Sequence, residues 1–265
     1  MDEKQLSADC FQYIIRTVFP AASRHNDTRS PVTHTEITAH LRSLGDREYA
    51  RHSLRYFKAE PGGYGHGDKF LGLRVPVVRE AVKKFSGASL DTAATLLKSA
   101  YHEVRLFALL LLVEQFGRSN AAGQEKIFRL YLEHTSCINN WDLVDGSAPY
   151  IVGHFLRDRD RSILYQLARS ESLWERRIAI LATFHYIRYR EYDDALCIME
   201  ILLHDPEDLI HKATGWMLRE IGKRDKSVAT AFLRLHQRTM PRTALRYAIE
   251  HFKPAERRAY LQGKA

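Results

Sequence analysis

The chain has 265 residues, 45% hydrophobic and 27% charged, so it can bury a substantial core in one large domain or two small ones. Its 40 Lys and Arg residues outnumber 32 Asp and Glu residues, and the formal charge of +8 fits a polyanionic partner, most simply nucleic acid, as well as general solubility. No apolar run approaches the roughly 18 residues of a transmembrane helix, and residues 1–4 lack a signal-peptide pattern, so we expect a soluble protein of the cytoplasm.

The first 32 residues differ from the rest of the chain. Residues 6–19 have the spacing of a helix, whereas residues 23–31 are polar and aperiodic, as is typical of a linker. We therefore predict an N-terminal appendage and linker over residues 1–32, and a helical domain over residues 33–265.

A glycine-rich segment at residues 60–68 is the other irregular part of the chain. It holds four glycines, but no Gly-Lys-Ser/Thr follows and no strand precedes it, which argues against a phosphate-binding P-loop. Two interpretations stay open, a flexible loop near a ligand, which we favour, and a plain connector.

Apolar residues recur at helical spacing through the remaining chain, and runs with strand alternation are scarce. Leu106, Leu109, Leu110 and Val113 form one such stripe, and the pattern predicts an all-α fold. Helical segments begin near residues 103, 141, 174, 209 and 241, roughly 30 to 40 residues apart, each followed by a shorter helical stretch. This period indicates a HEAT/armadillo-like helical-repeat solenoid with a concave, basic face.

Cysteine and histidine patterns give no metal site. The three cysteines, Cys10, Cys137 and Cys197, lack CxxC spacing, and the 13 histidines show no HExxH or paired ligand spacing. We expect free thiols and no metal.

Trp141 and Asp145 form the most informative pair in the sequence. Four residues apart on a predicted helix of residues 141–156, they share one face. A carboxylate in a plain core is costly, whereas beside an indole it suits a site that binds a flat or cationic group and stabilises positive charge. The alternative is an ion pair between Asp145 and Arg177 on the next helix of a solenoid.

Aromatic and basic residues recur on the later predicted helices, residues 174–187 and 209–221. Trp174 starts the first and is interpreted as packing between repeats. Arg176 and Arg177 are adjacent and point about 100° apart, so only one of them can face a groove; we choose Arg177. Trp216 alone fits a core position, but with Arg219 nearly one turn later it fits a ligand site equally well.

Four motifs, in order, together resemble the AlkD-type DNA alkylation repair proteins, a family of HEAT-like-repeat glycosylases that remove N3- and N7-alkylated purines. They are FLGLRVP at residues 70–76 with Arg79, WDLVD at 141–145, WERRIAI at 174–180 and KATGWMLRE at 212–220. The resemblance spans about residues 46–255 and leaves the N-terminal segment outside it.

The resemblance implies roles for six residues. Asp145 would be the catalytic carboxylate, Trp141 and Trp216 would line the lesion site, and Tyr56 would match an aromatic residue at the DNA. Arg177 and Arg219 would hold the DNA backbone. The family is associated with recognition that leaves the lesion stacked in the duplex, and the partner would be double-stranded DNA containing alkylated purines.

The expected function is a monofunctional alkylpurine glycosylase without a cofactor, acting as a monomer. A purine alkylated at N3 or N7 is already cationic, so one carboxylate that stabilises the oxocarbenium ion and positions water is sufficient. No lysine is placed for Schiff-base chemistry. Two alternatives stay open, a non-catalytic HEAT-like module that binds nucleic acid or acts as a scaffold, and a paralogue that has lost activity.

Overall fold

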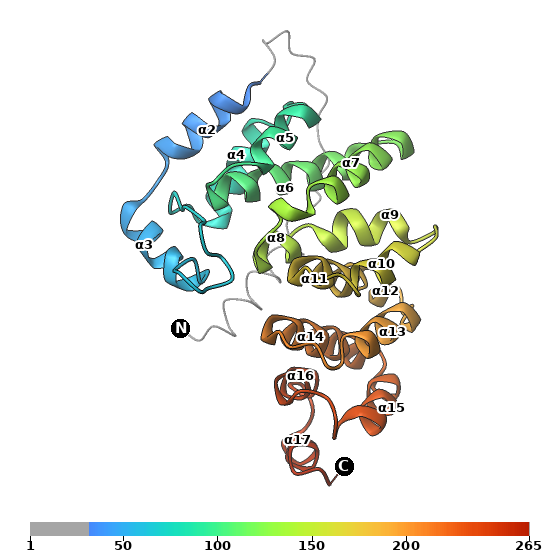
Figure 1. Cartoon of the computed structure of the whole chain (residues 1–265). Coiled ribbons are helices and arrows are strands. Elements are labelled where there is room, and N and C mark those ends of the chain that lie inside the picture. The colour runs from blue at the N-terminus through green and yellow to red at the C-terminus, as the bar shows by residue number, and fades with distance from the viewer. Residues whose placement is uncertain (1–31, 265) are drawn as a thin grey trace. The chain divides into compact units, whose positions relative to one another are not determined.

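A computed structural model of the protein describes residues 32–264, and this part of the chain is helical without any strand (Figure 1). Its one β-bridge joins Lys69 to Tyr101. The prediction of an all-α fold is confirmed. The predicted helix of residues 6–19, the linker and Cys10 lie outside the described residues. None of the described helices is long and apolar enough to cross a bilayer.

The helices follow one another with short connections, apart from the glycine-rich segment between the second and third. In chain order the elements are α2 (His34–Ser43), α3 (Arg47–Tyr56), α4 (Val75–Lys84), α5 (Leu90–Leu97), α6 (His102–Arg118), α7 (Ala121–Glu133), η1 (Thr135–Cys137), α8 (Trp141–Asp145), η2 (Pro149–Gly153), α9 (His154–Leu156), α10 (Ser162–Leu167), α11 (Leu173–Ala182), α12 (Phe184–Ile187), α13 (Asp193–Ile201), α14 (Asp208–Arg224), α15 (Lys226–His236), α16 (Arg242–Ala248) and α17 (Pro254–Leu261).

The described chain forms two compact units that meet in sequence between Ser147 and Ala148. The first is built around α6, which packs against α4, α5, α7 and α8 (Figure 1). From Val104 to Leu112 every side chain of α6 is buried, as expected for a helix that is apolar on all sides. The polar residues at its start, His102, Glu103 and Arg105, are buried as well and therefore need partners.

Side-chain caps begin most of the longer helices, because the first N–H groups of a helix have no partner within it. Asp46 accepts hydrogen bonds from the backbone N–H groups of Glu48 and Tyr49 at 2.8 and 3.0 Å. Further caps are Thr33, Ser89, Asn120, Asn140, Ser172 and Asp225. Asn140 is completely buried, so the start of α8 is fixed inside the first unit.

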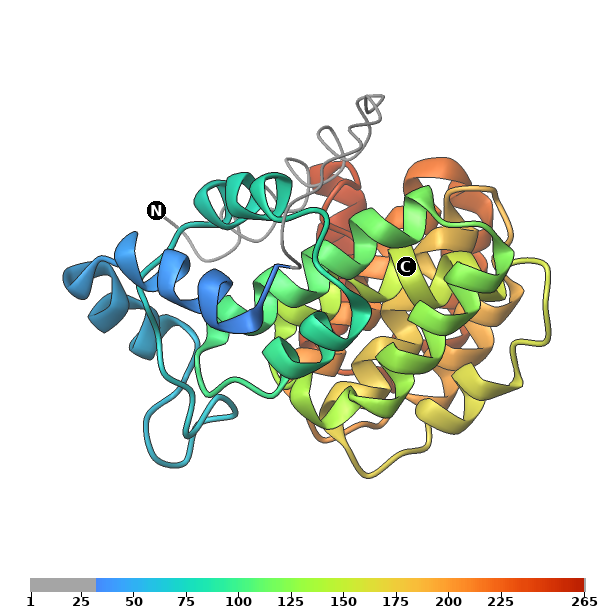
Figure 2. The same ribbon diagram turned by 90° about the horizontal axis from the view of Figure 1, so that it is seen from above.

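The glycine-rich segment folds back beside α3 and is tied to the start of α6 (Figure 2). The buried Glu103 carboxylate accepts hydrogen bonds from three consecutive backbone N–H groups, those of Leu71, Gly72 and Leu73, at 2.8 to 3.2 Å. A Cβ atom at Gly65 would lie 2.4 Å from the Phe57 carbonyl oxygen, so only glycine allows this close approach. The segment is thus anchored at both ends, and its contact with a ligand stays a prediction.

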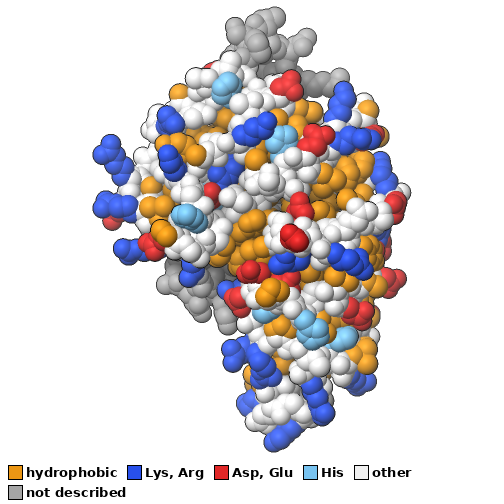
Figure 3. All heavy atoms as spheres, in the orientation of Figure 1, with side chains coloured by type: hydrophobic (Ala, Val, Ile, Leu, Met, Phe, Trp, Pro, Cys, Tyr) orange, Lys and Arg blue, Asp and Glu red, His pale blue; other side chains and the backbone are white. Residues whose placement is uncertain are grey.

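The second unit is built around α14, which packs against α11, α15 and α16. A Cβ atom at Gly215 would lie 2.3 Å from the Ala244 carbonyl oxygen, so a glycine there allows α14 and α16 to pack backbone to backbone. In both units the Lys and Arg side chains visible in Figure 3 are interspersed with acidic and apolar ones.

The first helices of the repeats begin at His102, Trp141, Leu173, Asp208 and Arg242, 32 to 39 residues apart. This spacing is compatible with a helical-repeat solenoid. Assignment to the HEAT type, the concave basic face and the domain limits of 1–32 and 33–265 stay predictions.

The continuous helix predicted over residues 141–156 is wrong in detail. The chain forms α8, a turn at Gly146–Ser147, the π-helical η2 and then α9. Pro149 has no N–H to donate to the carbonyl of Asp145, so the α-helical ladder is interrupted directly after α8. The predicted helix of residues 174–187 is similarly divided at Thr183 into α11 and α12.

Candidate active site

Trp141 begins α8 and packs in a cluster of aromatic rings within the first unit. Its ring stacks on Phe57 with centroids 5.6 Å apart, and Tyr56 meets it edge-on at 5.8 Å. Phe57 also stacks on Phe70 at 5.3 Å. We call these four residues the aromatic cluster. All four are half-buried, so the cluster presents ring surface to solvent.

His102 lies under the aromatic cluster, at the start of α6. Its ring centroid is 4.5 Å from that of Phe57 and 5.0 Å from that of Phe70, and its side chain is buried. The buried imidazole therefore packs directly against two of the half-buried rings.

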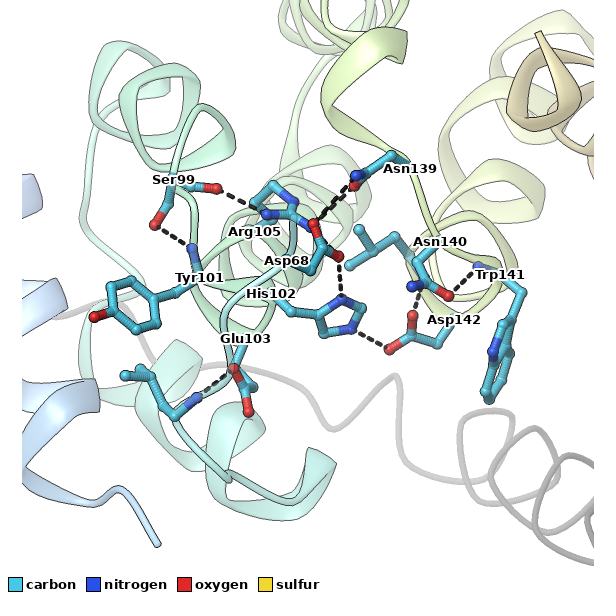
Figure 4. A network of polar contacts seen from close by, with 12 residues as sticks. Asp68, Ser99, Tyr101, His102, Glu103, Arg105, Asn139, Asn140, Trp141 and Asp142 are labelled. Carbon is cyan, nitrogen blue, oxygen red and sulfur yellow. Dashed lines mark hydrogen bonds and ion pairs between the residues drawn. The ribbon is translucent and has the colours of Figure 1, made fainter. Parts of the chain in front are cut away.

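A polar network surrounds His102 (Figure 4). Its Nε2 lies 2.8 Å from Oδ2 of Asp142, and its Nδ1 lies 3.5 Å from Oδ2 of Asp68. The Arg105 guanidinium donates hydrogen bonds to Asp68 at 2.7 Å and to the Asn139 side-chain oxygen at 2.9 Å. The glycine-rich segment, α6 and α8 are thus joined by side chains far apart in the sequence.

The network contains two acidic residues, Asp68 and Asp142, and two basic residues, His102 and Arg105. Each pair stabilises the charged form of the other. Burial lowers the pKa of His102, but the charge of Asp142 and hydrogen bonds to Asp142 and Asp68 outweigh it and raise the pKa to about 9. Burial raises the pKa of Asp68, yet hydrogen bonds from His102 and Arg105 and the charge of Arg105 hold that pKa below its usual value. At neutral pH His102 is therefore an imidazolium between carboxylates.

The raised pKa of His102 predicts a loss of stability at alkaline pH. The stabilisation is complete below the unfolded-state pKa near 6.5 and is lost as the pH rises through about 9. One pKa unit corresponds to about 1.4 kcal/mol, so the contribution at pH 7 is roughly 3 kcal/mol. Denaturant unfolding at pH 7 and pH 10 measures it. We expect the free energy of unfolding to fall by more in the wild type than in His102→Gln.

His66→Gln, which changes an exposed histidine of the glycine-rich segment, is the control for this experiment. It should follow the wild type at both pH values. An equal fall in the wild type and His102→Gln would contradict the charge assigned to His102.

Asp145 ends α8 and is 5% exposed. Burial raises the pKa of the Tyr131 hydroxyl; a hydrogen bond with Ser147 opposes this rise, and the negative charge of Asp145 adds to it. The Asp145 carboxylate thus lies close enough to Tyr131 to act on it, in surroundings that exclude most water. Its charge is little screened there.

The second unit holds the other three predicted residues. Arg177, on α11, is buried and donates a hydrogen bond to the Leu209 carbonyl oxygen at 2.6 Å. Trp216, on α14, is 8% exposed, and its ring centroid lies 6.5 Å from that of Phe184. Arg219 forms ion pairs with Glu220 and Glu250.

Of the six predicted site residues, the structure brings Tyr56 and Trp141 into contact in the first unit, and Asp145 lies one helical turn from Trp141.

No group of three or more potential metal ligands lies together in residues 32–264. Cys137 is half-buried and Cys197 exposed, and both are free thiols.

Comparison with known protein families identifies the family of the chain. The sequence profile of the DNA alkylation repair enzyme family matches residues 37–252. The chain belongs to this family. Its members act on damaged DNA, which implies a role in DNA repair.

A solved structure with the same fold is the "Predicted DNA alkylation repair enzyme from Enterococcus faecalis". The TM-score is 0.61 at 16% sequence identity, and the match covers 79% of this chain and 97% of that one. A comparison with curated proteins gives no match.

The network around His102 is not predicted by the sequence patterns. His102 is one of the histidines without ligand spacing, and Asp68 lies in the glycine-rich segment. One signal was available: His102, Glu103 and Arg105 start a helix that is apolar on all sides, so their side chains had to be buried and paired.

Proposed function

We propose that the protein is a monofunctional DNA glycosylase that hydrolyses the N-glycosidic bond of cationic N3- or N7-alkylated purines and leaves an abasic site. The observation that carries the proposal is the geometry of α8. One turn of helix sets the half-exposed Trp141, in its aromatic cluster, beside the buried Asp145 carboxylate. Family membership supplies DNA as the substrate.

The chemistry requires negative charge more than a proton donor. An alkylated purine that already carries a positive charge leaves without protonation, and the sugar develops oxocarbenium character as the bond breaks. A fixed carboxylate stabilises that cation and orients the attacking water, and preorganised electrostatic stabilisation of this kind often contributes more to catalysis than any other effect. We assign both tasks to Asp145.

The aromatic cluster supplies the second element of the proposal. Faces of Trp and Tyr rings attract cationic groups by about 0.5–2 kcal/mol. Trp141 and Tyr56 are half-buried and present ring surface to solvent. Phe57 stacks on Trp141 and itself packs against His102. We propose that they contact the lesion nucleotide while it stays stacked in the duplex. Trp216 is proposed to line the lesion site as well.

Arg177 and Arg219 are proposed to bind backbone phosphates. Arg219 is held by Glu220 and Glu250, so phosphate binding would exchange one anionic partner for another. We expect Arg177→Ala and Arg219→Ala each to weaken duplex binding and to reduce the slope of log K against log salt by about one. Binding titrations between low and physiological salt measure the slope.

Arg176→Ala is the matched control for the salt slope, because Arg176 forms two hydrogen bonds with Asp205 instead. Its slope should equal that of the wild type. Slopes unchanged in Arg177→Ala and Arg219→Ala would assign both residues to structure rather than to DNA binding.

The charge of the leaving base provides the test of this function. Base release is compared between duplexes containing one 7-methylguanine, one 8-oxoguanine or only normal guanine. We expect release of the cationic base alone, because the neutral bases need a general acid that the mechanism lacks. Release of 8-oxoguanine would contradict the mechanism. Tight binding of all three duplexes without release would favour a non-catalytic DNA-binding module.

A further inference from the structure

Two histidine rings stack on each other in the second unit, and neither is used by the proposed function. His154 begins α9 and His185 belongs to α12; their centroids are 4.9 Å apart, with 21° between the ring planes. The π-helical turn η2 ends at Gly153, directly before His154. A Cβ atom at Gly153 would lie 2.8 Å from the Cβ of His185. Only glycine therefore lets the two rings come together here.

A tyrosine and an arginine extend this group of rings toward solvent. Tyr189 lies 5.3 Å from His185 between ring centroids, and the Arg157 guanidinium lies 3.4 Å from the Tyr189 centroid. Tyr189 is 49% exposed, and His154 and Arg188 are exposed as well. We call His154, Arg157, His185, Arg188 and Tyr189 the histidine cluster. It combines aromatic faces with guanidinium groups, the combination that binds nucleic-acid strands.

The charges that face the two histidines are mostly positive. His154 is close to Arg157, Arg159 and Arg188 and to one acid, Asp158. His185 is close to Arg157, Arg188 and the acid Glu191.

Charged groups from the neighbouring helices are already paired. Glu191 accepts hydrogen bonds from Arg157 and Arg161. Two of the helices packed against α12 contribute charged residues. On α13, Asp194 accepts a hydrogen bond from Arg161. On α14, Arg224 donates a hydrogen bond to Glu220 and lies 5.8 Å from the Phe184 ring centroid. The charged residues of α11 are in its first half, at Glu175, Arg176 and Arg177. Within residues 32–264 neither Arg159 nor Arg188 forms an ion pair, so positive charge predominates around the stacked rings despite Asp158.

We propose that the histidine cluster is a binding site for a backbone phosphate of nucleic acid. A phosphodiester between Arg157 and Arg188 would compensate the charge of Arg188, share the Arg157 guanidinium with Glu191, and accept a hydrogen bond from an imidazole N–H. The exposed face of Tyr189 would lie beside the neighbouring nucleotide. The family's DNA substrate favours nucleic acid over other anions. The site requires DNA binding but no bond cleavage, so it does not depend on the proposed glycosylase.

Phosphate binding at this site is coupled to proton uptake. Burial lowers the pKa of His185, and His154, Arg188 and Arg157 lower it further, to about 4. Burial and the same arginines also lower the pKa of His154. Both rings are thus neutral at pH 7, although they lie among cations. The phosphodiester carries one negative charge, which raises both pKa values, so binding takes up protons and tightens as the pH falls toward them.

The test measures binding of the full-length protein to an undamaged duplex at pH 7.5 and pH 5.5 and constant ionic strength. We expect the wild type to bind more tightly at pH 5.5, by up to roughly tenfold for each proton taken up per pH unit. His154→Gln and His185→Gln should each lose part of this gain. His204→Gln, an exposed histidine of the same unit, should keep the full gain. An equal gain in all four proteins would overturn the proposal.

A second variant does not depend on the buried His185. Arg188 is exposed, so Arg188→Ala should fold as the wild type does. Its salt slope for duplex binding should fall by about one, with base release at saturating duplex unchanged. An unchanged slope would overturn the proposal. A wild-type protein that releases no base but shows both effects would refute the glycosylase and leave this site standing.

Inorganic phosphate distinguishes the source of the anion. Histidine ring signals of the wild type are followed by NMR during titration with inorganic phosphate and with an undamaged duplex. We expect the duplex to shift the signals of His154 and His185 at micromolar concentrations, and phosphate to have no effect below millimolar ones. Saturation by phosphate in the micromolar range would assign the site to the free ion and overturn the assignment to nucleic acid.

Discussion

Asp145→Asn is expected to abolish base release from a 7-methylguanine duplex while the variant still binds the DNA. The side chain keeps its shape and loses only its charge, so the developing sugar cation is no longer stabilised. Removal of one such electrostatic group typically costs a factor on the order of 10²–10³ in rate. Because Asp145 is 5% exposed, its charge acts with little screening, and the loss should reach or exceed this range. Binding should stay equal or become tighter, since one negative charge is removed.

Single-turnover base release and duplex binding, measured on the same preparations, separate the two effects. Asp142→Asn is the informative comparison, because it makes the same change one turn of α8 away. Asp142 is bonded to His102, so this variant should lose stability and keep most of its activity at temperatures where it is folded. Asp145→Asn with wild-type activity would refute the role assigned to the carboxylate.

Trp141→Ala should lower kcat/KM for the same duplex by about two- to thirtyfold. The indole contributes a cation–π contact of about 0.5–2 kcal/mol to a positively charged base. Its loss also removes the ring that stacks on Phe57 at 5.6 Å and meets Tyr56 at 5.8 Å. Trp141→Phe keeps an aromatic face and should recover part of the loss. Steady-state kinetics of the three proteins measure the series.

Trp174→Phe controls for general effects of changing a tryptophan, because Trp174 is half-buried in the first turn of α11 and we interpret it as packing. Its kinetics should match those of the wild type. If Trp141→Phe and Trp141→Ala lose activity equally, the contribution of the ring face is refuted. If neither loses activity, Trp141 does not contact the lesion.

Local patterns in the sequence predicted the all-α fold and the spacing within α8 correctly, but not where two of the helices are interrupted. The face shared by Trp141 and Asp145 depends only on a spacing of four residues in a helix, and α8 provides it. The break after Asp145 was signalled by Pro149, whereas the π-helical turn that follows has no local signature. Short-range spacing thus predicts the relative position of Trp141 and Asp145 on α8. The course of the chain after Asp145 depends on tertiary packing.

Contacts between distant residues could not be read from the sequence in the same way. Tyr56 was assigned to the site by family resemblance, and its contact with Trp141 joins residues 85 positions apart. The hydrogen bond between His102 and Asp142 spans 40 positions, and neither residue carries a motif that names its partner. Burial of charged groups at the start of α6 was predictable, but the identity of their partners depended on how the glycine-rich segment folds back.

The central claim is tested most directly by identifying the products formed by the wild type from a duplex with one 7-methylguanine. Mass spectrometry of base and strand, before and after cleavage at abasic sites, distinguishes the reaction classes. We predict free 7-methylguanine and an unbroken strand with one abasic site. A restored guanine with the methyl group on the protein, for example on Cys137 or Cys197, would identify direct dealkylation and contradict the account.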